Sequence, residues 1–177
     1  PPFILIPTGR PIVSNLNYSI ELGKISIYEG LTISSSSAFT IEMEFGETEE
    51  QMMIREMVRG FAEEDLAPTC LQRDREQSAP IEEWSVFCEK TGLQGITIPE
   101  EFGGSPVGDV TEAIIIEELA RVDPSFAVMF CVHVGLCSMT IALNGNEEQK
   151  SEYLPRLAGS EVGAYSLSEA GAGADAA

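Results

Sequence analysis

One histidine and two cysteines lie close together in the most apolar stretch of the sequence. His133 is the only histidine of the 177-residue chain, and it stands between Cys131 and Cys137. On a helix, His133 and Cys137 share a face because they are four positions apart, whereas Cys131 points elsewhere. A zinc site needs three or four converging ligands, and the sequence supplies no further ligand nearby. The spacing therefore favours a buried histidine of the core or of a pocket wall, and we expect no metal site.

The chain ends in a run of small residues, "SLSEAGAGADAA", at positions 166–177. A Rossmann dinucleotide loop needs G-x-G-x-x-G between a strand and a helix, with an acid about twenty residues further on. Gly171 and Gly173 supply only the first two glycines, so the Rossmann interpretation is rejected. Small residues in a turn also let backbone amides lie close to a phosphate or a flat ring. The run therefore indicates close approach of the backbone to a ligand.

Paired acids and serines invite a catalytic interpretation that their positions do not support. Most of the acid pairs fall on polar helix faces, where solvated surface is the better account. Glu100 and Glu101 lie between a proline and two glycines, so we expect them to shape a turn rather than to catalyse. Ser166 and Ser168 have no base nearby, because His133 belongs to an apolar helix. Nucleophilic catalysis therefore lacks its general base.

The composition is that of a globular protein with an acidic surface. Hydrophobic residues make up 44% of the chain, and 29 acids against 10 bases give a net charge of −19. This balance argues against nucleic-acid binding and against docking on anionic membranes. Four cysteines without a CxxC pair are typical of reduced thiols, so we expect a cytoplasmic protein, or a matrix protein in a mitochondrion. No apolar run approaches the roughly 20 residues that span a bilayer.

Residues 45–177 carry the signals of a helical domain. Thr48 and Gln51 have capping-box spacing, and apolar residues follow at helical intervals. Proline and glycine mark further helix ends. We expect helices at Thr48–Ala67, Pro80–Thr91, Asp109–Val122, Pro124–Leu143 and Glu147–Leu157. The fourth is apolar nearly all round and should be buried. "GLQGITIPEEFGG" at 92–104 should form an ordered turn, and Gly163–Leu167 should be the first strand of a new domain.

Residues 1–44 differ in character from the rest. They begin with Pro1 and contain repeated serines and short alternating stretches, which suggest extended segments. We find no chemistry in them. They are either a small strand-bearing extension or sequence foreign to the parent protein, and we favour the second interpretation.

Five blocks occur in an order that resembles the amino-terminal half of the acyl-CoA dehydrogenases, flavoproteins that desaturate acyl thioesters. The blocks are "TEEQMMIREMVRGFAEEDLAP", "GLQGITIPEEFGG", "IIIEELARVDPSFAVMFCVH", "NEEQKSEYLPRLAGSE" and "AYSLSEAGAGAD". The resemblance covers about Phe45 to Ala177 and implies a mainly α fold. Residues 45–160 would be an up-and-down helical bundle, residues 161–177 the truncated beginning of the middle β-domain, and residues 1–44 an unassigned extension. We therefore expect a fragment.

The last block implies the cofactor site. In the family this loop reads roughly (Y/F)-x-x-T-E-P-x-A-G-S-D and wraps the flavin. Ser168 stands where the family has threonine and keeps the hydroxyl, Ala170 replaces a proline, and Ala174 replaces a serine that contacts flavin phosphate or the thioester arm. The last change removes one hydrogen bond, worth about 1 kcal/mol. The implied FAD-binding residues are Tyr165, Ser166, Leu167, Ser168, Glu169, Ala170, Gly171, Ala172, Gly173 and Ala174, with Ala174 also at the substrate.

The resemblance implies a parent enzyme that converts acyl-CoA to enoyl-CoA and passes electrons from FAD to an electron-transfer flavoprotein. The parent would assemble as a tetramer or dimer. Its catalytic base would lie beyond Ala177, so we assign no catalytic residue. Met129, Val132, Leu136 and Met139 are candidates to line the acyl pocket, or are plain core. The alternatives are an acyl-CoA oxidase, a carrier-protein-linked dehydrogenase of the same fold, and a non-catalytic helical interaction module.

Overall fold

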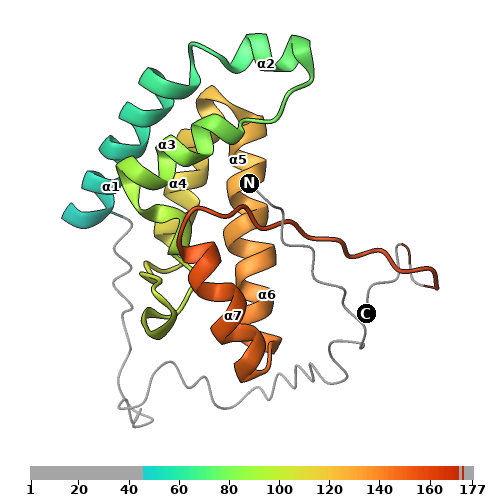
Figure 1. Ribbon diagram of the computed structural model, residues 1–177. Helices are drawn as coiled ribbons and strands as arrows, with labels where there is room; N and C mark the ends of the chain where they lie inside the picture. The colour runs from blue at the N-terminus through green and yellow to red at the C-terminus, as the bar shows by residue number, and fades with distance from the viewer. Residues whose placement is uncertain (1–45, 172, 174–177) are drawn as a thin grey trace, which may run out of the picture. The chain divides into compact units, whose positions relative to one another are not determined.

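The computed structural model describes residues 46–171 and 173, and this part of the chain is mainly helical (Figure 1). Its elements, in chain order, are α1 (Glu49–Phe61), the π-helical turn η1 (Ala62–Leu66), α2 (Cys70–Glu76), α3 (Ile81–Thr91), the 3₁₀ turns η2 (Leu93–Gly95) and η3 (Glu100–Phe102), α4 (Asp109–Val122), α5 (Pro124–Cys131), the π-helical segment η4 (Val132–Ser138), α6 (Met139–Asn144) and α7 (Glu147–Ala158). The expected mainly α fold is confirmed. The interpretation of residues 1–44 falls outside the described residues.

Side-chain caps explain where the helices begin. The Thr48 hydroxyl accepts from the amide of Gln51 at 3.2 Å, and the Gln51 side chain accepts from the amide of Thr48 at 3.0 Å. Asn146 and Gln149 form the same reciprocal box at the start of α7. Asp123 caps α5 by accepting from two amides of its first turn. These bonds satisfy amides that have no partner inside the helix.

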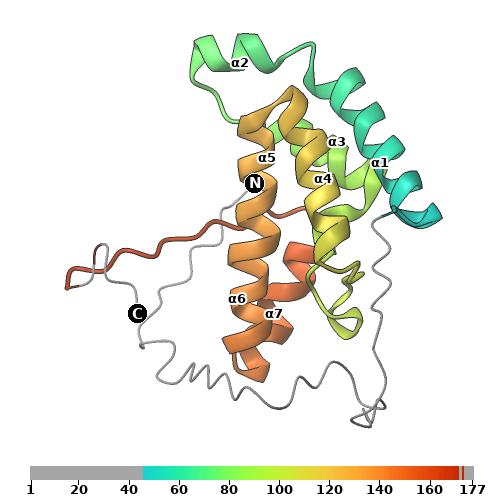
Figure 2. The same ribbon diagram turned by 180° about the vertical axis from the view of Figure 1, so that it is seen from behind.

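The segment from Pro124 to Asn144 is one continuous helical run with a π-helical middle (Figure 2). Thr97 donates its hydroxyl hydrogen to the Val134 carbonyl at 2.8 Å, inside the widened turn. The run has 21 residues, and its mean hydropathy reaches 2.1 over an 18-residue window. By length and composition it could therefore cross a membrane, so the sequence-based statement that no run approaches this length is wrong. A core helix of a globular protein passes the same test.

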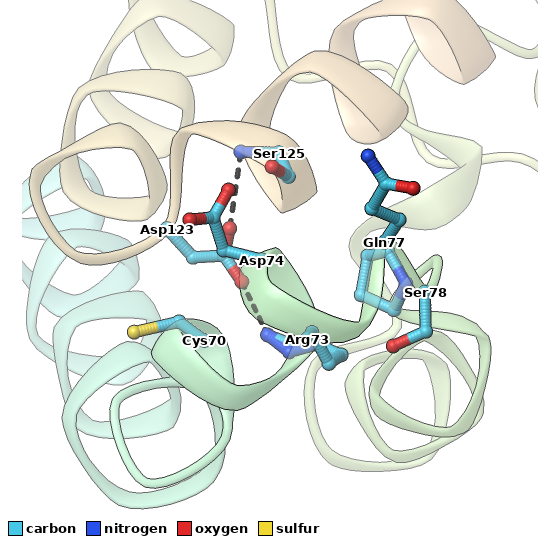
Figure 3. A pocket seen from close by; sticks show the side chains of 8 residues that line it. Cys70, Arg73, Asp74, Gln77, Ser78, Asp123 and Ser125 are labelled. Carbon is cyan, nitrogen blue, oxygen red and sulfur yellow. Dashed lines mark hydrogen bonds and ion pairs between the residues drawn. The ribbon is translucent and has the colours of Figure 1, made fainter.

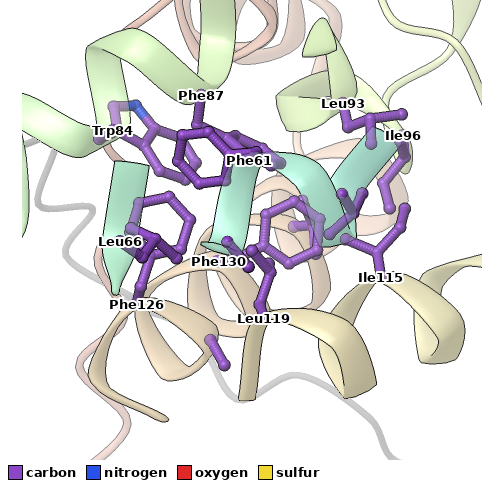
Figure 4. Close-up of a cluster of buried hydrophobic side chains, with 14 of the residues drawn as sticks. Phe61, Leu66, Trp84, Phe87, Leu93, Ile96, Ile115, Leu119, Phe126 and Phe130 are labelled. Atoms are coloured by element: carbon purple, nitrogen blue, oxygen red, sulfur yellow. The ribbon is translucent and has the colours of Figure 1, made fainter. Parts of the chain in front are cut away.

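Five aromatic side chains from three helices form the centre of the main core (Figure 4). Phe87 makes edge-to-face contacts with Phe61, Phe126 and Phe130, at ring-centroid distances of 5.1–5.5 Å. Trp84 packs beside them, 6.0 Å from Phe87. Such pairs add about 1 kcal/mol each to the gain from burial. The aromatic cluster therefore locks α1, α3 and α5 together.

A buried carboxylate joins α1 to α4. Glu118 on α4 is 3% exposed and accepts from Arg55 at 2.6 Å and from Arg59 at 2.8 Å. Arg121 lies 3.4 Å away. The hydrogen bond from Arg59, assisted by Arg55 and opposed by burial, lowers the pKa of Glu118 to about 2. Glu117, the next residue, is 69% exposed and reaches Arg55 at 3.1 Å.

The long helical run is buried on one side only, which corrects the expectation that it is buried all round. Phe126, Phe130 and Val134 are fully buried. Val128 and Leu143, in contrast, are 62% and 72% exposed. The helix is apolar on most sides, as the hydrophobic pattern predicts. Within residues 46–171, however, the neighbouring elements cover only part of its surface.

Two other expectations need correction. The helix α2 was not expected, because its sequence "CLQRDRE" has a single apolar position after Cys70 and no apolar period. The strand expected at Gly163–Leu167 does not form within residues 46–171: the backbone is irregular there, with only single bridge positions at Gly163 and Glu169. A strand needs a ladder of successive pairs, and residues 46–171 show only these isolated bridges here.

Candidate functional site

Four side-chain contacts anchor the segment that follows α7. Trp84 donates its indole N–H to the Ser160 carbonyl at 3.1 Å, and Gln94 donates its side-chain amide to the Ala158 carbonyl at 2.7 Å. Val162 is 3% exposed and belongs to the main core. The fourth contact comes from His133. The chain therefore leaves the helices in a defined direction rather than as a free tail.

His133 is fully buried, and both of its ring nitrogens face backbone groups. Nδ1 accepts from the Gly163 amide at 2.9 Å, which requires the proton on Nε2. Nε2 then donates to the Gln94 carbonyl at 3.1 Å. Burial lowers the pKa of His133 to about 4, and the carbonyls of Gln94 and Leu157 oppose this only in part. The ring is therefore neutral near pH 7, as expected of a core histidine.

Gly163 lies too close to η4 for any other residue. A Cβ at this position would be 2.7 Å from the Cys137 sulfur and 2.8 Å from the Cys137 Cβ. Burial raises the pKa of the Cys137 thiol, while the backbone of Ala164 opposes that rise. Cys137 is thus a buried packing residue that fixes the distance between the segment and the helix.

Beyond Gly163 the segment turns outward into solvent. Tyr165 is partly buried, and residues 166–171 are exposed. No atom lies within 4 Å of a Cβ built on Gly171 or Gly173, and neither residue has the positive φ that favours glycine. Neither local packing nor backbone conformation thus requires glycine at these positions. Their small size, with the exposed hydroxyls of Ser166 and Ser168, fits a surface that a flat ring or phosphate approaches closely. Ala172 and Ala174 lie outside the described residues.

The candidate acyl-pocket residues share one helical run but differ in exposure. Met129 packs against the main core, while Val132 and Met139 are partly buried. Leu136 is 44% exposed. Together with the exposed Val128, one turn of helix before Val132, they form an apolar face on the same run whose η4 segment holds Gly163. These residues therefore combine packing against the core, at Met129, with an exposed apolar surface at Leu136.

A polar cavity of about 220 Å³ lies elsewhere, between α2 and the start of α5 (Figure 3). Arg73 forms an ion pair with Asp123 and lies 3.2 Å from Glu83. All three side chains are nearly buried. Because every one of these charges has a partner and Asp123 also caps α5, the cluster holds α2 against α3 and α5. No local sequence pattern indicates this cluster, because Glu83 and Asp123 lie 10 and 50 positions from Arg73.

Comparison with known proteins decides the family. The family model described as "Acyl-CoA dehydrogenase, N-terminal domain" matches residues 48–161. The chain belongs to the acyl-CoA dehydrogenase family. The segment anchored by His133 begins just after the matched region, where the resemblance places the flavin loop.

Three relatives illustrate the similarity. The acryloyl-CoA reductase (NADH) of Anaerotignum propionicum is 40% identical over 135 residues, which cover 76% of this chain and 34% of the relative. The butyryl-CoA dehydrogenase structure from Megasphaera elsdenii matches with a TM-score of 0.68 and 34% identity, over 76% of this chain and 36% of that one. An acyl-CoA dehydrogenase from Bacillus anthracis, complexed with FAD, matches with a TM-score of 0.63 and 35% identity, over 73% and 22%. This chain thus spans about a third of the curated relative's length.

Proposed function

We propose that this chain is the amino-terminal part of an FAD-dependent acyl-CoA dehydrogenase that converts an acyl-CoA to its enoyl-CoA. The observation that carries the proposal is the exposed segment after Gly163, which resembles the family's flavin loop and is anchored on a helical domain of this family. When bound, FAD would accept the hydride from Cβ of the substrate, coupled to removal of the Cα proton by a base. That base would lie in a later domain of the parent protein.

The role of the residues in this chain is to bind and to orient. Ser168 would place its hydroxyl at the ring edge, and Tyr165 and Leu167 would pack along the ring. Leu167 is 51% exposed, so the described part of the chain leaves about half of this side chain open to a ligand. The apolar face around Val132 and Leu136 would form part of the wall along the acyl chain and exclude water from it.

The proposal extends to partners and location. The substrate would be an acyl-CoA thioester, the electron acceptor an electron-transfer flavoprotein, and the parent a tetramer or dimer in the cytoplasm or the mitochondrial matrix. The similarity to a reductase that takes NADH leaves the physiological direction to experiment. Exposed apolar side chains on one face of the long helical run, such as Val128 and Leu136, support assembly with further domains, because exposed apolar patches mark contact sites.

A chimera tests the proposal, with residues 48–171 of this chain replacing the matching part of the Megasphaera elsdenii butyryl-CoA dehydrogenase. We expect the chimera to bind FAD. Ser168→Ala should weaken FAD about fivefold, the loss of one hydrogen bond of about 1 kcal/mol. Ser151→Ala on the exposed surface of α7 is the matched control, because it removes the same hydroxyl outside the implied flavin loop, and it should change FAD affinity less than twofold. Equal effects of the two substitutions would refute the assignment of Ser168 to the flavin.

A further inference from the structure

A hydrogen bond between Gly163 and His133 joins the start of the exposed segment to the middle of the long helical run. His133 lies in η4, and Gly163 is 30 residues further along the chain. The histidine ring cannot shift freely, because it packs edge-on against Trp84, with the ring centroids 4.7 Å apart. Its Nε2 is also held by the Gln94 carbonyl. The acceptor Nδ1 therefore stands at a fixed point of the core.

The hydrogen bonds from Trp84 and Gln94 fix the position of the chain before Gly163 but not the direction in which it departs. Trp84 and Gln94 bond to carbonyls of Ser160 and Ala158, which precede Gly163. Gly163 donates its hydrogen bond to His133 from inside the core, and the exposed residues begin three positions later at Ser166. Contact with Cys137 sets the distance to η4, and the Ala164 backbone hydrogen-bonds to the Cys137 thiol. The Gly163 amide itself is oriented by Nδ1 of His133, which thereby sets the start of the path that the next residues follow.

We propose that His133 is a positioning residue for the segment Tyr165–Gly171: its Nδ1 holds the Gly163 amide and thereby sets the direction in which the segment leaves the helical domain. The inference deepens the proposed function, because that segment is the one assigned to FAD. His133 itself would touch neither flavin nor substrate. It is distinct from the loop residues in acting through the backbone of Gly163.

Two substitutions separate the two hydrogen bonds of the ring. In His133→Asn the side-chain oxygen can occupy the place of Nδ1 and accept from Gly163, while the bond to Gln94 is lost. In His133→Gln the side-chain amide nitrogen can occupy the place of Nε2 and donate to the Gln94 carbonyl, while the acceptor for Gly163 is lost. Both variants remove the aromatic contact with Trp84, so they are matched for lost packing.

Amide hydrogen exchange measured by NMR on the complete 177-residue chain tests the positioning directly. Relative to the core amide of Leu119, Gly163 should exchange about tenfold faster in His133→Gln than in His133→Asn, because only the first leaves a buried amide without an acceptor. Equal exchange of Gly163 in the two variants would overturn the proposal, whether or not the protein binds flavin.

The chimera supplies the second measurement. FAD should bind about tenfold more weakly to the His133→Gln chimera than to the His133→Asn chimera, which should rescue most of the affinity. If Gly163 exchange separates the variants but FAD affinity does not, positioning of the cofactor is refuted. If the unsubstituted chimera binds no FAD, the proposed function fails, and the exchange experiment alone decides whether His133 directs the segment.

Discussion

Acidification should destabilise this protein through His133. The folded state holds its pKa at about 4, against the ordinary value of 6.5 in the unfolded chain. Between these values the unfolded chain binds more protons, so stability falls as the pH is lowered from 6.5 to 4 and is fully retained above 6.5. The interval is about 2.5 pH units at about 1.4 kcal/mol each, which gives a loss of about 3 kcal/mol. Cys137, four residues further along η4, has a raised pKa and stays neutral throughout.

Urea unfolding followed by circular dichroism at several pH values from 4 to 7.5 measures this loss. Carboxylates also titrate at the acid end, so His133→Asn is the control that shares every carboxylate but lacks the ring. The free energy of unfolding of the native chain should fall by about 3 kcal/mol more than that of the variant over this range. If the free energies of unfolding of the two proteins change in parallel with pH, the conclusion that His133 is buried and neutral in the folded state would be refuted.

Three further outcomes follow from the same structure. Glu118→Gln should lower the free energy of unfolding in urea by about 3 kcal/mol, because three arginines lose a buried negatively charged partner. Glu117→Gln, on the exposed side, should lower it by less than about 1 kcal/mol. Similar losses for the two variants would contradict the role of Glu118 as the buried partner of these arginines. Gly104→Ala should lower the free energy of unfolding by at least about 2 kcal/mol, because the new Cβ would lie 1.9 Å from the Ile98 carbonyl oxygen. Gly60→Ala on α1 should raise the melting temperature, because no atom lies within 4 Å of the new Cβ. The isolated chain should purify colourless and without dehydrogenase activity, and stoichiometric bound flavin in an absorbance scan would contradict this.

The helix positions were predictable because their signals are local. Thr48 and Gln51 form the expected capping box, Asp123 and Pro124 begin a helix as expected, and Gly92 ends α3 in the left-handed conformation at φ 67°. Each signal acts within a few residues, so it can be recognised from the sequence alone. Asn146 at the start of α7 is a further example.

The features that the sequence did not reveal depend on contacts between distant residues. The π-helical turn in η4 contains the Val134 carbonyl, to which Thr97 donates from 37 positions away. The anchoring of Gly163 by His133 and the ion pair of Arg73 with Asp123 span 30 and 50 positions. The expected strand after Gly163 did not form because strand propensity alone provides no ladder partner. Long-range pairing has no local signature, so only the fold could supply it.

The most direct test of the central claim is an anaerobic titration of the chimera with butyryl-CoA, followed by visible absorption. If this chain supplies a working flavin-loop segment and part of the acyl wall, the chimera will be yellow, and its flavin absorption will bleach as the substrate reduces the cofactor. A chimera that folds and assembles like the Megasphaera elsdenii enzyme but remains colourless, or stays yellow after butyryl-CoA and longer acyl-CoA thioesters are added, would contradict the account.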